Sequence, residues 1–426
     1  MFMDNNLIQK QKAILVGIDT GEYDLEHSLE ELSELAKTAG AEVIGIFTQN
    51  RQSAENATFI GGGKLREIAE FAENQQADLL IFDGELSGTQ LRNISDITGV
   101  DVVDRTTLIL DIFAGRATSA EGKLQVELAQ QKYRLPQLIG AGNVLSRQGG
   151  GIGTRGPGET KLETDRRYIR RRIHALELQL KEMEKRRGLM RRKRQKSGVP
   201  IIAIVGYTNV GKSTLLNLLT GADIYAKDQL FATLDPTARE LRLPDGQQAV
   251  IIDTVGLIER LPHGLVEAFH STLEVAAEAD VILTVCDYAS PYCREQLEVT
   301  GQVLDELGCG DIPRITVFNK IDLDPTSAAA AETIPVQGVR QVFISAAEKR
   351  GIDRLMNMIS DCLSESVTTV QLLVPYQNGG LTDTIRREGS ILNEEYTENG
   401  VRLTATIPKR SLFRYRDFLT DTAAAE

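Results

Sequence analysis

The segment that most constrains the fold is Gly206-Tyr-Thr-Asn-Val-Gly-Lys-Ser213, which follows the apolar run Ile201–Val205 and precedes a second apolar run, Leu215–Leu219. This order matches G-x-x-x-x-G-K-[ST] in the strand–loop–helix context that the motif requires. The two glycines let the backbone wrap closely around phosphate groups, and the start of the following helix directs amide groups at them. A chance glycine-rich turn would not bring both flanks with it. The segment therefore predicts a P-loop domain.

Each part of this loop has an expected role. Lys212 should reach the β- and γ-phosphates of a bound nucleotide, and the Ser213 hydroxyl should bind Mg²⁺. The backbone of the remaining residues should surround the phosphates. The predicted phosphate-binding residues are Gly206, Tyr207, Thr208, Asn209, Val210, Gly211, Lys212 and Ser213.

A second motif indicates which base is bound. Asn319-Lys320-Ile321-Asp322 follows the strand-like run Arg314–Phe318 and resembles the NKxD signature of GTPases. In that signature the aspartate accepts hydrogen bonds from N1 and N2 of guanine, and adenine offers no such pair of donors. Ser345-Ala346-Ala347 follows a further strand, where a guanine-contacting loop is expected. The predicted base-binding residues are Asn319, Lys320, Ile321, Asp322, Ser345, Ala346 and Ala347, and the expected ligand is GTP or GDP.

Two segments between these motifs resemble the switches of GTPases. Asp253-Thr254-Val255-Gly256 resembles the DxxG motif, with Asp253 near Mg²⁺ and the Gly256 amide on the γ-phosphate. Phe231-Ala232-Thr233-Leu234-Asp235 resembles a first switch in which Thr233 binds Mg²⁺, and Thr237 is the competing candidate. We expect γ-phosphate to order both segments. The residues assigned to the hydrolysis step are Lys212, Thr233 and Gly256, and the metal ligands are Ser213 and Thr233.

The residue after DxxG departs from the Ras-like pattern. Those proteins carry a glutamine that positions the attacking water, whereas Leu257 can neither donate nor accept a hydrogen bond. The sequence therefore predicts slow hydrolysis that a partner stimulates. In similar GTPases, an asparagine at the position of Asn209 together with a hydrophobic residue after DxxG can accompany a K⁺ ion that acts as an arginine finger. Asn209 could equally serve only to order the loop.

The chain as a whole reads as α/β. Apolar runs at Ala13–Ile18, Val43–Thr48, Leu79–Asp83 and Val100–Val103 alternate with helical patterns at Leu25–Lys37, Lys64–Gln75 and Thr89–Ile97. This alternation indicates a parallel sheet covered by helices. From Val199 it resumes, and we expect strands at Ile201–Val205, Ala249–Asp253, Val281–Asp287, Arg314–Asn319 and Gln341–Ser345.

Two further regions complete the predicted organisation. Residues 118–196 carry apolar residues at helical spacing and should form an antiparallel helical hairpin. The last part reads as a small α+β domain with strands Thr369–Val374, Ser390–Thr397 and Val401–Ile407 and helices Thr382–Arg387 and Arg410–Leu419. We predict an N-terminal α/β domain at 1–116, a hairpin with a Gly-rich loop at 117–197, a P-loop GTPase domain at 198–366 and an α+β domain at 367–426.

Charge is segregated along the chain. Residues 161–196 hold fifteen basic and five acidic residues, a local balance of +10, whereas the net charge of the whole chain is -12. A solvated helix face or a basic linker would also explain a run of charges, but an excess this large in an acidic protein favours RNA as a partner. The Gly-rich stretch at 149–158 precedes the basic run and should form the loop at the hairpin tip, because glycine costs about 1 kcal/mol in a helix. The stretch at 149–158 lacks G-K-[ST], so it is not a second phosphate loop. The other glycine-rich segment, Gly61-Gly62-Gly63-Lys64, is not a phosphate loop either and should start a helix.

The sequence contains no pattern for a membrane span, a secretory signal or a metal cluster. It has no apolar run of about 18 residues, and its first residues lack an apolar core with a small-residue cleavage site. The four cysteines, at 286, 293, 309 and 362, form no C-x-x-C pair and should be reduced thiols. We therefore expect a monomeric cytoplasmic protein.

Together these motifs resemble the HflX family of ribosome-associated GTPases over nearly the whole chain. The most specific are the loop GGGIGTRGPGETKLETDRR at 149–167 and FATLDPT at 231–237, with GYTNVGKS, DTVG and NKID in the same order. The resemblance implies GTP hydrolysis, binding to the large (50S) ribosomal subunit and its RNA, and dissociation of stalled or stress-inactivated ribosomes. It also implies that the hairpin tip reaches ribosomal RNA near the peptidyl-transferase centre.

Two rival readings remain open. A signalling switch acting on a protein effector would not need the basic hairpin. A tRNA-modifying GTPase would need a catalytic constellation outside the GTPase domain, and none is evident in the sequence.

Overall fold

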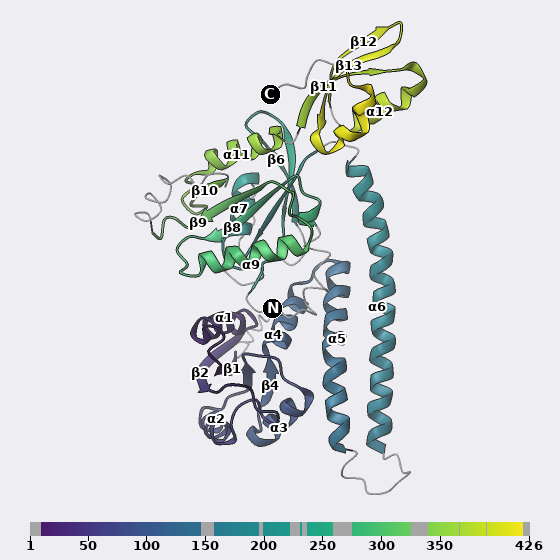
Figure 1. Ribbon diagram of the computed structural model, residues 1–426. Coiled ribbons are helices and arrows are strands. Elements are labelled where there is room, and N and C mark those ends of the chain that lie inside the picture. Colours follow the sequence, from purple (N-terminus) through teal and green to yellow (C-terminus); the bar gives the residue numbers. More distant parts are fainter. Residues whose placement is uncertain are drawn as a thin grey trace, which may run out of the picture. The chain divides into compact units, whose positions relative to one another are not determined.

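The computed structural model describes residues 10–145, 157–195, 199–221, 231, 237–258, 275–324, 340–365, 367–388 and 390–420. The chain forms two compact units, each of which mixes helices and sheets (Figure 1). The first comprises residues 1–181, 227–235 and 258–270, and the second comprises 182–226, 236–257 and 271–426. Among the described residues, no helix has both the length and the apolar character needed to cross a membrane.

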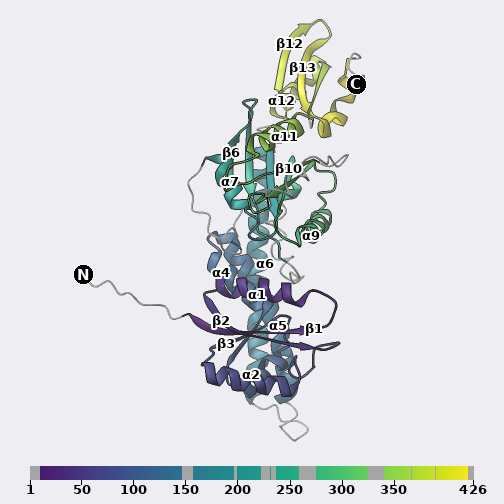
Figure 2. The same cartoon turned by 90° about the vertical axis from the view of Figure 1, so that its left-hand side faces the viewer.

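The first unit begins with a four-stranded parallel sheet in the order β2-β1-β3-β4. Its strands are β1 (Gln11–Asp19), β2 (Ala41–Asn50), β3 (Leu79–Phe82) and β4 (Asp101–Asp104). The helices are α1 (Leu25–Thr38), α2 (Gly62–Gln75), α3 (Gly88–Thr98) and α4 (Arg105–Arg116). α1 and α2 lie on opposite faces of the sheet (Figure 2). Residues 13–16 of the central strand β1 are consequently buried on both faces, as in other parallel sheets.

Local capping explains where several of these helices start. The Asp24 side chain accepts a hydrogen bond from the His27 amide at 3.1 Å, and Asp104 does the same for Thr107 at 2.8 Å. Ser87 and Gln90 form a reciprocal capping box at the start of α3. Such side chains satisfy amides that the first helical turn leaves unpaired.

The predicted hairpin is formed by α5 (Ala120–Leu145) and α6 (Pro157–Gln195). Arg172 Nε and Nη2 donate to the two carboxylate oxygens of Glu127 at 2.6 and 2.7 Å, and Lys132 pairs with Glu177 at 3.2 Å. Leu128 of α5 and Leu176 of α6, which belong to the apolar residues at helical spacing, are both buried. The Gly-rich tip, residues 146–156, lies outside the described residues.

α5 also packs against the N-terminal sheet domain. Tyr133 Oη donates to Asp104, whose carboxylate also accepts the Leu86 amide at 3.0 Å. Gly88 lies so near α5 that a Cβ atom there would be 2.0 Å from the Gln137 carbonyl oxygen. The close approach requires glycine at this position, and it anchors the hairpin to the N-terminal sheet domain.

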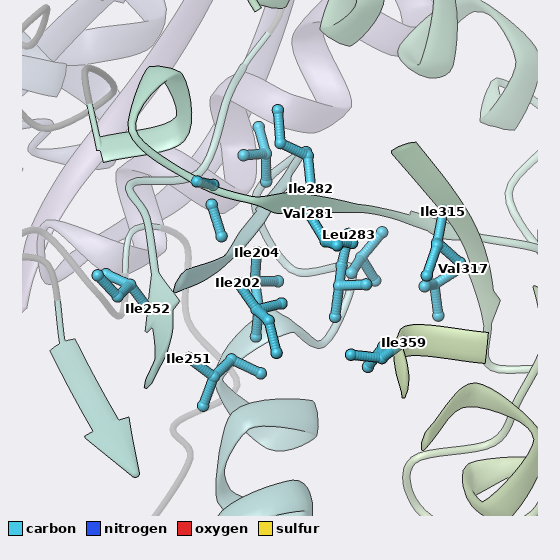
Figure 3. Packing of buried hydrophobic residues seen from close by; sticks show 14 of the residues in the cluster. Ile202, Ile204, Ile251, Ile252, Val281, Ile282, Leu283, Ile315, Val317 and Ile359 are labelled. Carbon is cyan, nitrogen blue, oxygen red and sulfur yellow. The ribbon is translucent and has the colours of Figure 1, made fainter. Parts of the chain in front are cut away.

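The second unit contains a six-stranded sheet in the order β10-β9-β8-β5-β7-β6. Its strands are β5 (Ile201–Gly206), β6 (Thr237–Arg242), β7 (Gln248–Asp253), β8 (Val281–Asp287), β9 (Arg314–Asn319) and β10 (Gln341–Phe343). Helices α7 (Lys212–Thr220), α9 (Cys293–Glu306) and α11 (Ile352–Glu365) accompany it. Ile202 and Ile204 of β5 pack between Ile251 of β7 and Leu283 of β8 in the core (Figure 3).

The chain ends in a three-stranded antiparallel sheet in the order β11-β13-β12. Its elements are β11 (Val367–Val374), η1 (Tyr376–Asn378), α12 (Gly379–Glu388), β12 (Ser390–Thr397), β13 (Gly400–Pro408) and η2 (Lys409–Phe418). Leu372, Leu403 and Tyr415 are buried in its core.

The predicted α/β architecture is confirmed, with three local differences. Helix α4 and the edge strand β6, which pairs with β7 in antiparallel orientation, were not predicted. Where an α-helix was expected at Arg410–Leu419, the chain forms the 3₁₀ helix η2, Lys409–Phe418. β6 was missed because its sequence, Thr-Ala-Arg-Glu-Leu-Arg, contains no apolar run, and Leu241 is its one buried residue. The predicted start of α2 at the glycines 61–63 is confirmed.

Candidate functional site

The predicted phosphate loop leaves the buried central strand β5 and enters α7. Gly211, at the start of α7, has φ +93°, and a Cβ atom there would lie 2.4 Å from Asn319 Nδ2. Both the backbone angle and the close approach exclude larger residues. A Cβ on Gly206 would likewise lie 2.1 Å from the Val285 carbonyl oxygen. The two motif glycines are therefore required by packing against β8 and β9 as well as by the loop itself.

Lys212 is turned onto its own loop. Its Nζ atom donates to the carbonyl oxygens of Gly206 at 3.0 Å and Tyr207 at 2.5 Å. Burial lowers the pKa of Lys212 from 10.5 to about 8, and the nearby Asp253 carboxylate opposes that shift. Burial disfavours the charged ammonium form of Lys212. The negative charges of a bound polyanion would favour that charged form.

Ser213 and Asp253 form a pair of oxygen donors beside the loop. Ser213 Oγ donates to Asp253 Oδ2 at 2.8 Å, and Asp253 is fully buried at the end of β7. Hydroxyl and carboxylate oxygens are the protein ligands that Mg²⁺ prefers. The two predicted motifs that carry these residues are separated by forty positions and meet here because β5 and β7 are adjacent.

The DxxG segment continues this pairing onto the loop. The Thr208 amide donates to the Leu257 carbonyl at 2.8 Å, and the Leu257 amide donates to the Gly206 carbonyl at 3.1 Å. The Leu257 side chain is buried in the sheet core. A Cβ on Gly256 would lie 2.7 Å from Thr208 Cγ2 and 3.0 Å from Lys212 Nζ. Gly256 is thus held directly against the predicted phosphate loop.

The two predicted base-binding loops are joined to each other and to the phosphate loop by Asn319. Its Nδ2 donates to the Val210 carbonyl at 2.9 Å, and its Oδ1 accepts the Ala346 amide at 3.0 Å. The Ser345 side chain is buried and accepts the Glu348 amide at 3.0 Å. One buried side chain therefore connects three motifs that the sequence analysis found separately.

Lys320 is supported by residues that the sequence analysis did not single out. The Nζ atom of Lys320 pairs with Asp287 Oδ2 at 2.7 Å. Tyr288, which follows Asp287 in the chain, donates its amide to the Asn319 carbonyl at 2.8 Å. Lys320 has φ 63°, a strained angle for a lysine, so the loop depends on these supports. The position of Asp287 at the end of a predicted strand next to β9 is the sequence feature that could have revealed its role.

The first-switch segment is described only at Phe231. Its ring is buried and packs edge-to-face against Phe113 of α4, with the ring centroids 4.5 Å apart. Ala232, Thr233, Leu234 and Asp235 lie outside the described residues. Thr237, the alternative to Thr233, is the first residue of β6.

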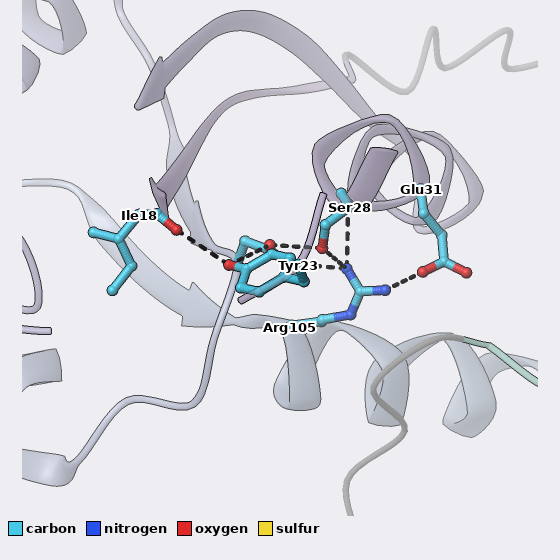
Figure 4. Close-up of polar contacts among 6 residues, drawn as sticks. Ile18, Tyr23, Ser28, Glu31 and Arg105 are labelled. Carbon is cyan, nitrogen blue, oxygen red and sulfur yellow. Dashed lines mark hydrogen bonds and ion pairs between the residues drawn. The ribbon is translucent and has the colours of Figure 1, made fainter. Parts of the chain in front are cut away.

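The N-terminal sheet carries a polar cluster at the carboxyl end of its strands (Figure 4). Arg105 is buried, pairs with Asp83 at 2.9 Å and also contacts Glu31. Ser28 Oγ donates to Asp83 at 2.7 Å, and Tyr23 Oη donates to the Ile18 carbonyl at 3.2 Å. The buried guanidinium of Arg105 has two carboxylate partners, so its charge is paired within the cluster. The cluster links α1, β3 and α4, and this structural role explains it.

Comparison with known proteins assigns the chain to a family. Residues 26–114 match a family model described as GTP-binding GTPase N-terminal, 116–194 match GTP-binding GTPase Middle Region, and 201–320 match 50S ribosome-binding GTPase. The chain is 53% identical to the GTPase HflX of Caldanaerobacter subterraneus subsp. tengcongensis, covering 96% of this chain and 94% of that protein. It belongs to the HflX family of GTPases.

Other HflX relatives match over a similar extent. The GTPase HflX of Lacrimispora saccharolytica is 48% identical, over 94% of each chain. That of Escherichia coli K12 is 42% identical, over 93% of this chain and 94% of the relative. The predicted resemblance is therefore confirmed, and the chain is a GTP-hydrolysing P-loop protein of the HflX family.

Proposed function

We propose that the chain couples GTP binding and hydrolysis to association with the large (50S) ribosomal subunit, and that it separates stalled or stress-inactivated ribosomes. The observation that carries this proposal is the row of cations on α6. Five of them are solvent-exposed, and within the described part of the chain none of the five forms an ion pair. They are Arg167, Arg170, Arg171, Lys181 and Lys185.

These cations suit a polyanion rather than a structural role. Arg172 on the same helix differs from these five cations, because it forms an ion pair with Glu127 that links the two helices of the hairpin. Exposed cations that repeat along one helix instead supply phosphate contacts and raise the association rate with RNA. One of the matching family models carries the description 50S ribosome-binding GTPase, which supports the ribosome as the source of that RNA.

In this proposal the nucleotide site works as the motifs predict. The loop at 206–213 surrounds the phosphates, with Lys212 on the β- and γ-phosphates, and Asp322 accepts from the guanine base. Residues 345–347 contact the base from the other side. The hydrogen bonds of Asn319 support this reading because they hold these loops at one end of the sheet.

Ser213 fits a Mg²⁺ ion, with Asp253 behind it and Thr233 completing the site. The oxygen pair Ser213–Asp253 is the structural support for this assignment. When bound, Mg²⁺ neutralises charge on the β- and γ-phosphate oxygens. Ser213 would then hold the metal, and Asp253 would orient the Ser213 hydroxyl.

Leu257 supports slow hydrolysis by the chain alone. Its side chain is buried and its backbone is paired with the phosphate loop, so no polar side chain stands at this position to orient water. We propose that the ribosome, or a K⁺ ion held beside Asn209, supplies the missing group. Asn209 has φ 60°, a left-handed angle that asparagine tolerates well, so a structural role for it remains the alternative. Equal GTPase rates in potassium and sodium buffers would exclude the K⁺ ion.

The test of ribosome association is sedimentation through a sucrose gradient with ribosomes and a non-hydrolysable GTP analogue. The wild-type chain should migrate with the large subunit. A variant with Arg167, Arg170 and Arg171 changed to Glu should remain at the top of the gradient. The matched control changes three exposed arginines of other elements, Arg66, Arg294 and Arg402, to Glu and so has the same net charge.

Three outcomes would contradict the proposal. The first is wild-type chain that fails to co-migrate with the large subunit, and the second is equal loss of binding in both triple variants. The third is binding that does not weaken with salt, because each phosphate contact should steepen the salt dependence. Salt-insensitive binding to a protein would instead favour the signalling switch.

A further inference from the structure

The carboxylate of Asp287 is held at both of its oxygens at the end of β8. Its Oδ1 accepts the Ala289 amide at 3.0 Å, and its Oδ2 lies 2.7 Å from Lys320 Nζ. The first contact folds the chain back after β8, as aspartate side chains often do in turns. The second contact crosses to the neighbouring strand, because Asp287 pairs with Asn319 in the register of β8 and β9. The ammonium group of Lys320 is thus held from β8, outside its own loop.

Asp322, two residues after Lys320, is the residue whose carboxylate we assign to the guanine base. The residue is partly buried. Within the described part of the chain, its side chain has no hydrogen-bond or ion-pair partner. An acceptor for guanine needs to be unoccupied, because a carboxylate that is already paired has to give up that partner before it can bind the base. The Asp322 side chain meets this requirement.

Lys320 is placed along the chain where it could occupy that carboxylate. A lysine and an aspartate two positions apart in a loop can reach ion-pair distance, since the lysine side chain is long and flexible. Such a pair would compete with guanine for the same carboxylate oxygens. Asp287 offers the ammonium group a different carboxylate, and in the structure Lys320 pairs with Asp287 and not with Asp322.

The backbone of the loop is held by contacts that do not use the Asp287 carboxylate. The Tyr288 amide donates to the Asn319 carbonyl at 2.8 Å, and the Leu323 amide donates to the Lys320 carbonyl at 3.1 Å. The Tyr288 ring packs edge-to-face against Phe318, with the ring centroids 5.9 Å apart. These contacts remain when Asp287 loses only its charge. The effect of that charge can therefore be measured separately from the path of the loop.

We propose that Asp287 is a positioning residue for guanine binding, which holds the Lys320 ammonium group and so keeps the Asp322 carboxylate open to N1 and N2 of the base. Asp287 does not touch the nucleotide and acts through Lys320. The inference rests on the proposed guanine role of residues 319–322. It adds a residue outside the NKID motif, on a different strand, on which the affinity for GDP depends.

The experiment measures the dissociation constant of a fluorescent GDP analogue from the full chain. Asp287→Asn removes the charge and keeps an oxygen that can accept the Ala289 amide, so the turn persists. We expect this variant to bind GDP about fivefold more weakly than the wild type, which is the effect of one partly exposed ion pair. In a Lys320→Met background the same change should have no effect, because no ammonium group is left to occupy Asp322.

The matched control is Asp305→Asn. It makes the same chemical change in the same unit and breaks the 2.6 Å ion pair between Asp305 and Arg314, the first residue of β9. The guanine loop follows the last residue of that strand, so Asp305→Asn should bind GDP as the wild type does.

Salt gives a readout that a purely structural role would not change. The screening length falls from about 10 Å at 0.1 M to about 3 Å at 1 M ionic strength, so the competing attraction between Lys320 and Asp322 weakens. The dissociation constant of Asp287→Asn, divided by that of the wild type, should therefore approach one in concentrated sodium chloride.

Three results would overturn the proposal. These are wild-type GDP affinity in Asp287→Asn, a loss of affinity that is equally large in the Lys320→Met background, and a loss that high salt does not reduce. Asp322→Ala separates this question from the assignment of the site. If Asp322→Ala binds GDP as tightly as the wild type, the guanine role of residues 319–322 fails. If Asp322→Ala binds weakly and Asp287→Asn does not, only the role of Asp287 fails.

Discussion

Asn319 Nδ2 donates a hydrogen bond to the Val210 carbonyl oxygen at 2.9 Å, across 109 positions of the chain. The same side chain accepts the Ala346 amide at 3.0 Å, and Asn319 is 2% exposed. A single amide group, which is both donor and acceptor, thus determines the spacing of the phosphate loop and the two predicted base-binding loops. This arrangement explains why the motif requires asparagine at this position rather than an aspartate or a leucine of similar size.

Asn319→Ala should weaken both the fold and nucleotide binding. It leaves the buried Val210 carbonyl and Ala346 amide without their partner, which typically costs about 1–3 kcal/mol for each unsatisfied group. We expect lower urea stability and GDP affinity reduced at least tenfold. Asn393→Ala, at an exposed position of β12, is the control and should change neither measurement. Unchanged GDP affinity in Asn319→Ala would show that this side chain does not organise the site.

Ser213→Ala tests the proposed metal ligand. The change removes the hydroxyl that donates a hydrogen bond to Asp253. In our proposal it also removes one oxygen ligand of the Mg²⁺ ion. We expect the GTP affinity of the wild type to rise with Mg²⁺ and that of Ser213→Ala to be nearly independent of it, with a loss of about tenfold or more at saturating metal. Isothermal titration with and without chelator measures both.

The chain offers a closely matched control for that variant. Ser360 Oγ donates to Asp245 at 2.6 Å and forms the same kind of pair outside the nucleotide loops. Ser360→Ala should cost about 1 kcal/mol of stability and keep the full Mg²⁺ dependence. A variant Ser213→Ala that responds to Mg²⁺ as strongly as Ser360→Ala does would remove Ser213 from the metal site.

The buried Lys212 should make nucleotide-free stability depend on pH. Its pKa is lowered from 10.5 to about 8 by burial. Below that value both the folded and the unfolded chain carry the charge, and the folded chain bears the cost of burying it. Above it the folded chain releases the proton first, so the unfolded chain binds more protons and the free energy of unfolding rises with pH.

Lys212→Met isolates this effect because it removes the titrating group. Urea unfolding of the nucleotide-free proteins should show the wild type gaining stability relative to Lys212→Met from about pH 7.5 to about pH 9.5. Subtracting the two curves cancels the other titrating groups. Parallel stability curves for the two proteins over that range would contradict the lowered pKa.

Gly88→Ala should loosen the hairpin from the N-terminal sheet domain. A Cβ atom at this position would lie 2.0 Å from the Gln137 carbonyl oxygen, so α3 and α5 would have to separate. We expect a loss of about 1–3 kcal/mol in urea unfolding. Gly115→Ala is the control, since Gly115 lies within α4 and has open space around it. Alanine there should stabilise by up to about 1 kcal/mol, and equal behaviour of the two variants would refute the close contact.

Much of the fold could be predicted because its patterns are local. Strands such as β1 and β5 are short apolar runs. The P-loop, DxxG and NKID motifs each occupy a few consecutive residues. β6 was not predicted because an edge strand of this kind has no apolar run. The type of η2 was not predicted because helix propensity does not distinguish a 3₁₀ helix from an α-helix over ten residues. The roles of Asp287 and Tyr288 were not predicted because the sequence shows only that Asp287 ends a predicted strand. The pairing of β8 with β9, which brings these residues to Lys320 and Asn319, is decided by the tertiary structure.

The sequence by itself determined the order of the nucleotide motifs, the prediction of guanine as the bound base, the helical spacing of apolar residues in the hairpin and the charge of α6. These depend on residue type and spacing along the chain, which folding does not alter. Only the tertiary structure decided that Ser213 meets Asp253 and that Leu257 is buried against the predicted phosphate loop. Such contacts depend on strand order and register, because the loop that leaves β5 and the end of β7 meet only where these two strands pair as neighbours.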